Sequence, residues 1–160
     1  MIRLQHYTQK MVIRLISSSQ QTHQNNFLYF WPMVIQVSAG VIVSVKTKFE
    51  PAYSNSQKNQ FLFSYKIKIE NTNEYSVQLT HRHWHIFDSD GTTQEVKGEG
   101  VVGEQPILEE GESYEYESGC NLKTSIGRMW GTYRFIRLMD ESEFVVQIPA
   151  FTLMAPEKMN

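Results

Sequence analysis

Residues 61–70 alternate between apolar and polar side chains with a period of two, and this pattern constrains the fold more than any other feature. The odd positions carry Phe61, Phe63, Tyr65, Ile67 and Ile69. The even positions are mostly polar. Successive side chains of a β-strand point to opposite faces, whereas an amphipathic helix needs apolar residues three and four apart. The segment therefore predicts a strand with one face in a hydrophobic core.

The same alternation recurs between short turn signals. Besides 61–70, we expect strands at residues 41–46, 77–87, 92–97, 113–117, 128–139 and 143–153. The runs Asp88-Ser89-Asp90-Gly91 and Asp140-Glu141-Ser142 are typical of tight turns. No stretch carries convincing helical periodicity. The chain is therefore predicted to be all-β, an antiparallel β-sandwich of about seven strands of the immunoglobulin or fibronectin type III kind.

The first 32 residues differ from the rest in composition. They contain three basic residues and no acidic residue, and the first acidic residue is Glu50. Such a composition is typical of an organellar targeting segment, or of residues that precede a true start at Met33. We favour the second interpretation. The expected organisation is an extension outside the fold over residues 1–32, a domain over 33–154 and a tail over 155–160.

Composition also limits the partners. All 17 acidic residues and only part of the 15 basic residues lie after residue 32, so the domain is acidic, unlike a typical nucleic-acid-binding surface. No apolar run reaches the roughly 18 residues of a membrane-spanning helix. Cys120 is the single cysteine, which excludes an internal disulfide and favours a reducing compartment. We expect a cytoplasmic protein that binds neither nucleic acid nor membrane, with organellar targeting by residues 1–32 left open.

The segment Gly98-Glu99-Gly100-Val101-Val102-Gly103 has the glycine spacing of a dinucleotide-binding fingerprint. That fingerprint needs a helix after the last glycine, and Pro106 and Gly111 leave no room for one. The simplest interpretation is a connection between strands that requires positive φ angles. The alternative is an anion-binding nest of backbone amides for phosphate or pyrophosphate. Its candidate residues are Gly98, Gly100 and Gly103.

His81, His83 and His85 alternate along a predicted strand and therefore share one face. Neighbouring histidines lie roughly 6.6 Å apart along a strand, so two of them can reach one cation, whereas the outer two are about 13 Å apart. A further ligand has to come from an adjacent strand or from the acidic loop, for instance Glu99 or Asp88. The alternative is a solvated or partly packed row of histidines without a metal.

Catalytic interpretations have little support in the sequence. Cys120 and His83 could act as nucleophile and base, but a lone cysteine is more often a small packed residue. The acidic run Glu109, Glu110 and Glu112 surrounds a glycine in a predicted turn, where carboxylates are normally solvated. We therefore expect no enzymatic activity.

Three residues are candidates for contact with a protein partner: Arg82, Trp84 and Trp130. Both tryptophans are expected in or near the core. Trp130 lies on the face opposite to Met129, Gly131 and Tyr133. If it is exposed, it is a plausible anchor for a partner, since tryptophan is enriched at interaction hot spots.

Several motifs spread over the predicted domain resemble the ApaG family. They are Arg82-His83-Trp84, the segment from Gly98 to Pro106, Gly127-x-Met129-x-Gly131-x-Tyr133 and Ile148-Pro149-x-Phe151. The resemblance runs from about Val34 to Met154. It implies a fibronectin type III-like sandwich, a domain found alone in bacteria and attached to F-box or polymerase-interacting proteins in eukaryotes. It also implies a link of the bacterial forms to cobalt and magnesium resistance.

From this resemblance we expect a non-catalytic module that binds a protein partner. The alternative function is binding of phosphate or pyrophosphate by the glycine segment, with or without a divalent cation. We expect no cofactor, and a divalent cation at the histidines remains open.

Overall fold

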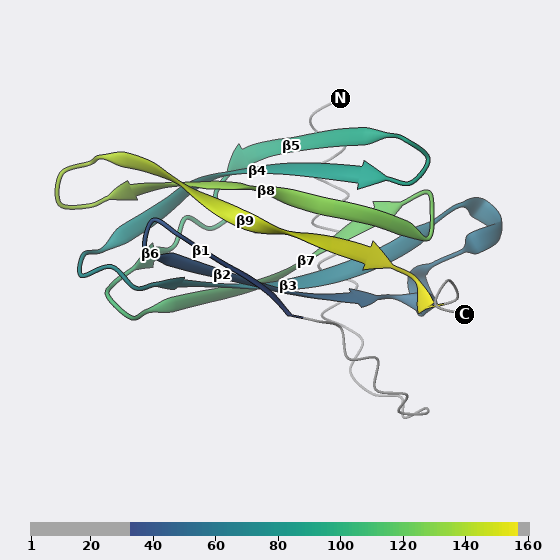
Figure 1. Ribbon diagram of the computed structural model, residues 1–160, viewed down its shortest axis with the longest axis horizontal. Coiled ribbons are helices and arrows are strands. Elements are labelled where there is room, and N and C mark those ends of the chain that lie inside the picture. The colour runs from purple at the N-terminus through teal and green to yellow at the C-terminus, as the bar shows by residue number, and fades with distance from the viewer. Residues whose placement is uncertain (1–32, 157–160) are drawn as a thin grey trace.

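The computed structural model describes residues 33–156, which form two antiparallel sheets packed face to face (Figure 1). One sheet has the strand order β1-β2-β3-β7, and the other has the order β5-β4-β8-β9, with β6 also paired to β4. The strands are β1 (Val34–Ser38), β2 (Val41–Phe49), β3 (Phe61–Asn71), β4 (Val77–Asp88), β5 (Thr93–Glu99), β6 (Ile107–Leu108), β7 (Ser113–Leu122), β8 (Ile126–Arg137) and β9 (Glu143–Met154). The predicted all-β sandwich is confirmed.

Each of the seven predicted strands corresponds to a strand of the structure, and β1 and β6 are additional. β1 joins β2 through a tight turn at Ala39 and Gly40, both with positive φ. Such turns suit the twist of a two-residue hairpin. β6 has only two residues, too few to show any alternation. Within residues 33–155 the only helical elements are two short 3₁₀ turns, Pro51–Tyr53 and Ser56–Lys58.

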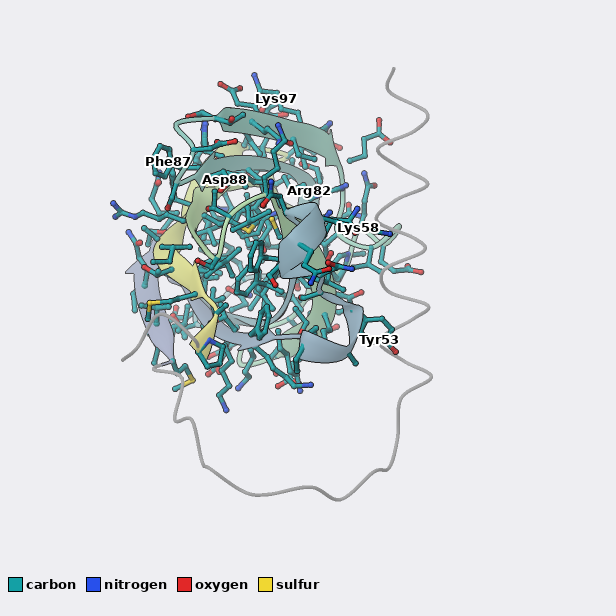
Figure 2. All side chains as sticks on the ribbon, turned by 90° about the vertical axis from the view of Figure 1, so that its right-hand side faces the viewer. Tyr53, Lys58, Arg82, Phe87, Asp88 and Lys97 are labelled. Atoms are coloured by element: carbon teal, nitrogen blue, oxygen red, sulfur yellow. The ribbon has the colours of Figure 1, made fainter. Side chains whose placement is uncertain are left out.

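The core lies between the two sheets and is rich in aromatic side chains (Figure 2). The odd-numbered side chains of β3 from Phe63 to Ile69 are at most 2% exposed, as the alternation predicts. The ring of Tyr65 lies 5.7 Å from the ring of Trp84 and 5.8 Å from that of Phe151, both in the opposite sheet. Burying such rings stabilises the fold by roughly 1.5–3 kcal/mol each.

Two irregularities change which side chains face outward. In β4 the register with β8 shifts between Leu79 and His81, so that Thr80 is an extra residue. In β9 the register shifts opposite Trp130, where Pro149 lacks a donor for the ladder. As a result Leu79 and Trp84 both face the core although their positions differ in parity.

The ends of the domain differ in part from the expectation. The predicted extension 1–32 lies outside the described residues. Ala155, expected to begin a tail, is 1% exposed, and its amide donates a hydrogen bond to the Ser125 carbonyl at 2.8 Å. The packed domain therefore extends beyond residue 154. No helix within residues 33–156 is long and apolar enough to span a membrane.

Candidate functional site

The three histidines lie on the outer face of the five-stranded sheet, with Trp84 on its inner face. β5 runs along one side of β4, and the register places Glu99, Lys97 and Glu95 opposite His81, His83 and His85. β8 runs along the other side and places Arg134, Thr132 and Trp130 opposite the same histidines. The sequence prediction that the histidines share a face is thus confirmed.

His83, His85 and Glu95 form a compact cluster on this face. His83 Nε2 lies 2.9 Å from Glu95 Oε2, and His85 Nδ1 lies 3.8 Å from Glu95 Oε1. The two imidazole rings are 4.3 Å apart between centroids. One ligand atom from each residue lies within 4.8 Å of the others. The three side chains can therefore converge on one small ion.

The surroundings orient the cluster and keep its carboxylate charged. The hydrogen bond with His83, and then that with Lys97, lowers the pKa of Glu95 below its usual value. The Lys97 ammonium lies 3.4 Å from Glu95 Oε2. The Trp130 ring stacks on the His85 ring, 5.4 Å away and tilted by only 10°. This stacking holds the imidazole of His85 beside the carboxylate.

Of the predicted metal ligands, His83 and His85 belong to the cluster, whereas His81 and Glu99 do not. His81 and Glu99 pair with each other in the register, next to the pair of His83 and Lys97, and both are exposed. Glu95 takes the place that was assigned to Glu99. The turn could have indicated this, because a tight reversal at residues 88–91 makes β4 and β5 a hairpin and pairs residue 85 with residue 95.

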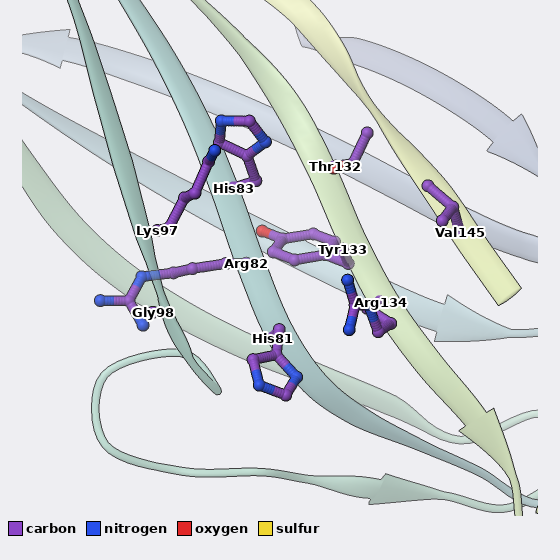
Figure 3. A pocket seen from close by; sticks show the side chains of 9 residues that line it. All are labelled: His81, Arg82, His83, Lys97, Gly98, Thr132, Tyr133, Arg134 and Val145. Carbon is purple, nitrogen blue, oxygen red and sulfur yellow. The ribbon is translucent and has the colours of Figure 1, made fainter. Parts of the chain in front are cut away.

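A shallow depression of about 290 Å³ lies beside the cluster (Figure 3). Its charged members are Arg82, Lys97 and Arg134. The side chains of Lys97 and Arg134 are 67% and 51% exposed. Val145 of β9 also lines the depression and is an apolar side chain that is 53% exposed. The complete lining is His81, Arg82, His83, Lys97, Gly98, Thr132, Tyr133, Arg134 and Val145.

The glycine segment connects β5 to β6 along the edge of β4. The Gly100 amide donates to the Thr80 carbonyl at 2.7 Å, and Val101 and Glu104 exchange hydrogen bonds of 2.8 and 2.9 Å between their backbones. Gly100 and Gly103 both have positive φ. The amides of Gly100 and Val101, and that of Glu104 next to the segment, thus donate within the protein and cannot bind an anion while they do so. The interpretation as a strand connection accounts for these glycines.

Gly98 differs from the other two glycines because it lies inside β5. A Cβ at this position would come within 3.1 Å of the Arg82 guanidinium. Arg82 Nη1 donates to the carbonyls of Glu99 and Gly100 at 2.8 and 2.7 Å. Gly100, one of the candidate phosphate residues, therefore presents its carbonyl oxygen to an arginine of the protein. Arg82, a candidate for partner contact, fastens the segment to β4.

The remaining candidates separate into core and surface. Trp84 is 1% exposed, so it packs in the core and offers no contact area to a partner. Trp130 lies on the outer face and is partly exposed.

The predicted catalytic candidates do not form a site. Cys120 is buried in β7 of the other sheet, and burial, with a smaller effect of Asp88, raises the pKa of its thiol to about 12. It therefore forms no nucleophile and base pair with His83. The predicted acidic turn at residues 109–112 is exposed.

These features define a two-layer antiparallel β-sandwich of the immunoglobulin or fibronectin type III kind, with a histidine-bearing outer face. A family model described as the ApaG domain matches residues 51–137. The chain belongs to the ApaG domain family.

Relatives of known name agree with this family. Protein ApaG of Brucella canis is 42% identical over 126 residues, which cover 79% of this chain and 96% of that protein. Protein ApaG of Methylocella silvestris is 45% identical over 124 residues, covering 78% and 95%. The crystal structure of the putative ApaA protein from Bordetella pertussis is similar with a TM-score of 0.69 and 40% identity, over 79% of this chain and 97% of that one.

Proposed function

We propose that this protein is a binding module that recognises an acidic segment of a protein partner through the outer face of its five-stranded sheet. The depression between Lys97 and Arg134 is the observation that supports this most. It places two exposed cationic side chains beside the exposed apolar Val145. A carboxylate of the partner can pair with the Arg134 guanidinium while a neighbouring apolar side chain covers Val145.

The size of the depression favours a side chain over a small-molecule ligand. At about 290 Å³ it lies at the lower limit of ligand pockets, which enclose roughly 300–1,000 Å³. Trp130 lies on the same face and supplies a rigid aromatic contact area of the type found at interaction hot spots.

We further propose that the module carries out no reaction of its own. The single cysteine is buried, and its raised pKa leaves almost no thiolate near neutral pH. The two relatives described above carry the name Protein ApaG, which states no reaction. Both observations support a binding role.

A charge-reversal pair tests the binding surface. Arg134→Glu reverses a cation at the depression, and Lys66→Glu reverses an exposed cation on the four-stranded sheet, where Lys66 pairs with Glu115. In affinity capture from the native cell, followed by titration of the purified partner, Arg134→Glu should weaken binding at least tenfold and Lys66→Glu less than twofold. Equal binding by both variants would contradict the proposal. If pyrophosphate shifts the amide signals of residues 98–103, the phosphate-binding alternative gains the support instead.

A further inference from the structure

We infer that His83, His85 and Glu95 form a binding site for a divalent transition-metal ion such as Zn²⁺ or Co²⁺. The inference does not depend on the proposed partner surface, because it rests on the ligand geometry of this cluster alone. Two imidazole nitrogens and one carboxylate oxygen are a ligand set that occurs at zinc sites with an open coordination position.

The distances within the cluster fit a common ion. Ligand atoms at about 2.0–2.2 Å from a tetrahedral zinc lie roughly 3.3–3.5 Å from one another. His83 Nε2 lies 2.9 Å from Glu95 Oε2, just below this range, and His85 Nδ1 lies 3.8 Å from Glu95 Oε1, just above it. One ligand atom of each residue lies within 4.8 Å of the others, so rotations of these three side chains are expected to bring the ligands to one ion.

The protein already holds the ligands in place. β4 presents both imidazoles on one face, and the β4–β5 register sets Glu95 directly opposite His85. The Trp130 ring lies flat against the His85 imidazole and limits its rotation. Groups that orient the ligands of a metal in this way contribute to its affinity.

The donor chemistry selects the type of metal. Imidazole suits Zn²⁺, Co²⁺, Ni²⁺ and Cu²⁺, whereas Mg²⁺ and Ca²⁺ prefer oxygen ligands. Three protein ligands leave at least one coordination position for water or for a side chain of a partner. The Lys97 ammonium lies 3.4 Å from Glu95 and repels a metal cation bound there. It is therefore expected to lower the affinity of the site for the metal.

Calorimetric titration with Zn²⁺, on the full chain freed of any histidine tag, tests the site with matched variants. Glu95→Gln and His85→Ala should each lower the affinity at least tenfold. Glu99→Gln and His81→Ala change the same residue types on the same two strands and should stay within twofold of the wild type. Lys97→Met should raise the affinity severalfold. Mg²⁺ should give no saturable binding.

Two results would overturn the inference. One is a wild-type chain without saturable Zn²⁺ binding, and the other is an equal loss of affinity in Glu99→Gln and Glu95→Gln. A measurement on the wild type alone guards against misfolded variants. Co²⁺ should broaden the amide signals of His83, His85 and Glu95 more than those of His81 and Glu99, and uniform broadening would contradict the site.

Discussion

The backbone amide of Gly100 donates a 2.7 Å hydrogen bond to the carbonyl oxygen of Thr80, the extra residue of β4. The side-chain amide of Gln105 donates to the same carbonyl at 3.1 Å. The carbonyl of the extra residue in β4 is therefore the acceptor that holds the glycine segment against the sheet. The segment leaves the edge of β4 at Gly100 and returns to it where Pro106 accepts a hydrogen bond from the Leu79 amide at 3.0 Å.

Gly100→Ala should destabilise the domain strongly. Gly100 has a φ of 55°, and a Cβ there would lie 2.1 Å from the Glu104 carbonyl oxygen. Gly111→Ala is the control, because Gly111 has a φ of 75° with no atom within 4 Å of such a Cβ. We expect the free energy of unfolding to fall by about 1–2 kcal/mol in the control and by about 1–3 kcal/mol more in the Gly100 variant. Equal decreases in urea unfolding would show that the contact with Glu104 does not destabilise the variant.

Val102→Asn should stabilise the protein. Val102 and Gly103 are the central residues of a two-residue turn closed by Val101 and Glu104, and both have positive φ. Asn-Gly is the favoured pair in such turns, whereas a β-branched residue is strained there. We expect the free energy of unfolding, measured with urea, to rise by about 0.5–1 kcal/mol. Val102→Thr keeps the branch at Cβ and should show no gain, so a similar gain in both variants would point to the loss of exposed apolar surface.

Cys120 should be unreactive in the folded protein. It is buried, and desolvation raises the pKa of its thiol to about 12. Near pH 8 the nucleophilic thiolate is therefore almost absent, in addition to being shielded. Labelling with a thiol reagent should follow the global unfolding of the chain, rising with denaturant at the same midpoint as the fluorescence change. Rapid labelling without denaturant would show that β7 opens locally.

How far the sequence predicts this structure depends on how local each feature is. The alternation in residues 61–70 was sufficient to place one face of β3 in the core, because a strand's faces follow from neighbouring residues alone. The irregularity at Thr80 has no glycine or proline to indicate it, and it depends on pairing with β8 and on the Gly100 hydrogen bond. β6 has only two residues, too few for an alternation that the sequence could show.

In the candidate metal cluster, too, some features follow from neighbouring residues and others depend on pairing between strands. The shared face of the histidines follows from their spacing, and β5 was expected to return from the turn at residues 88–91. The choice between Glu95 and Glu99 required the register, which only the turn geometry fixes. The stacking of Trp130 on His85 joins β8 to β4 across 45 positions of the chain, and no local pattern predicts such a contact.

Stability should fall as the pH rises above 10, because three tyrosines are buried in the core. Burial raises the pKa of Tyr65 from 10.0 to about 12 and also raises the pKa values of Tyr116 and Tyr133, whose hydroxyl groups are hydrogen-bonded to each other. Between pH 10 and 12 the unfolded chain releases phenolic protons that the folded chain retains. The unfolding free energy is therefore unaffected by these groups below pH 10 and decreases above it, by up to about 1.4 kcal/mol per pH unit for each tyrosine.

Tyr65→Phe separates this effect from the titration of surface lysines, which also weakens ion pairs such as that between Lys66 and Glu115 in the same pH range. The variant should have a shallower decrease than the wild type in urea unfolding at pH 9, 10 and 11, because one titrating phenol is gone. Absorbance at 295 nm should show these phenolates forming together with unfolding. Identical slopes in the two proteins would mean that Tyr65 ionises in the folded state at its ordinary pKa, which its complete burial between the sheets makes energetically unfavourable.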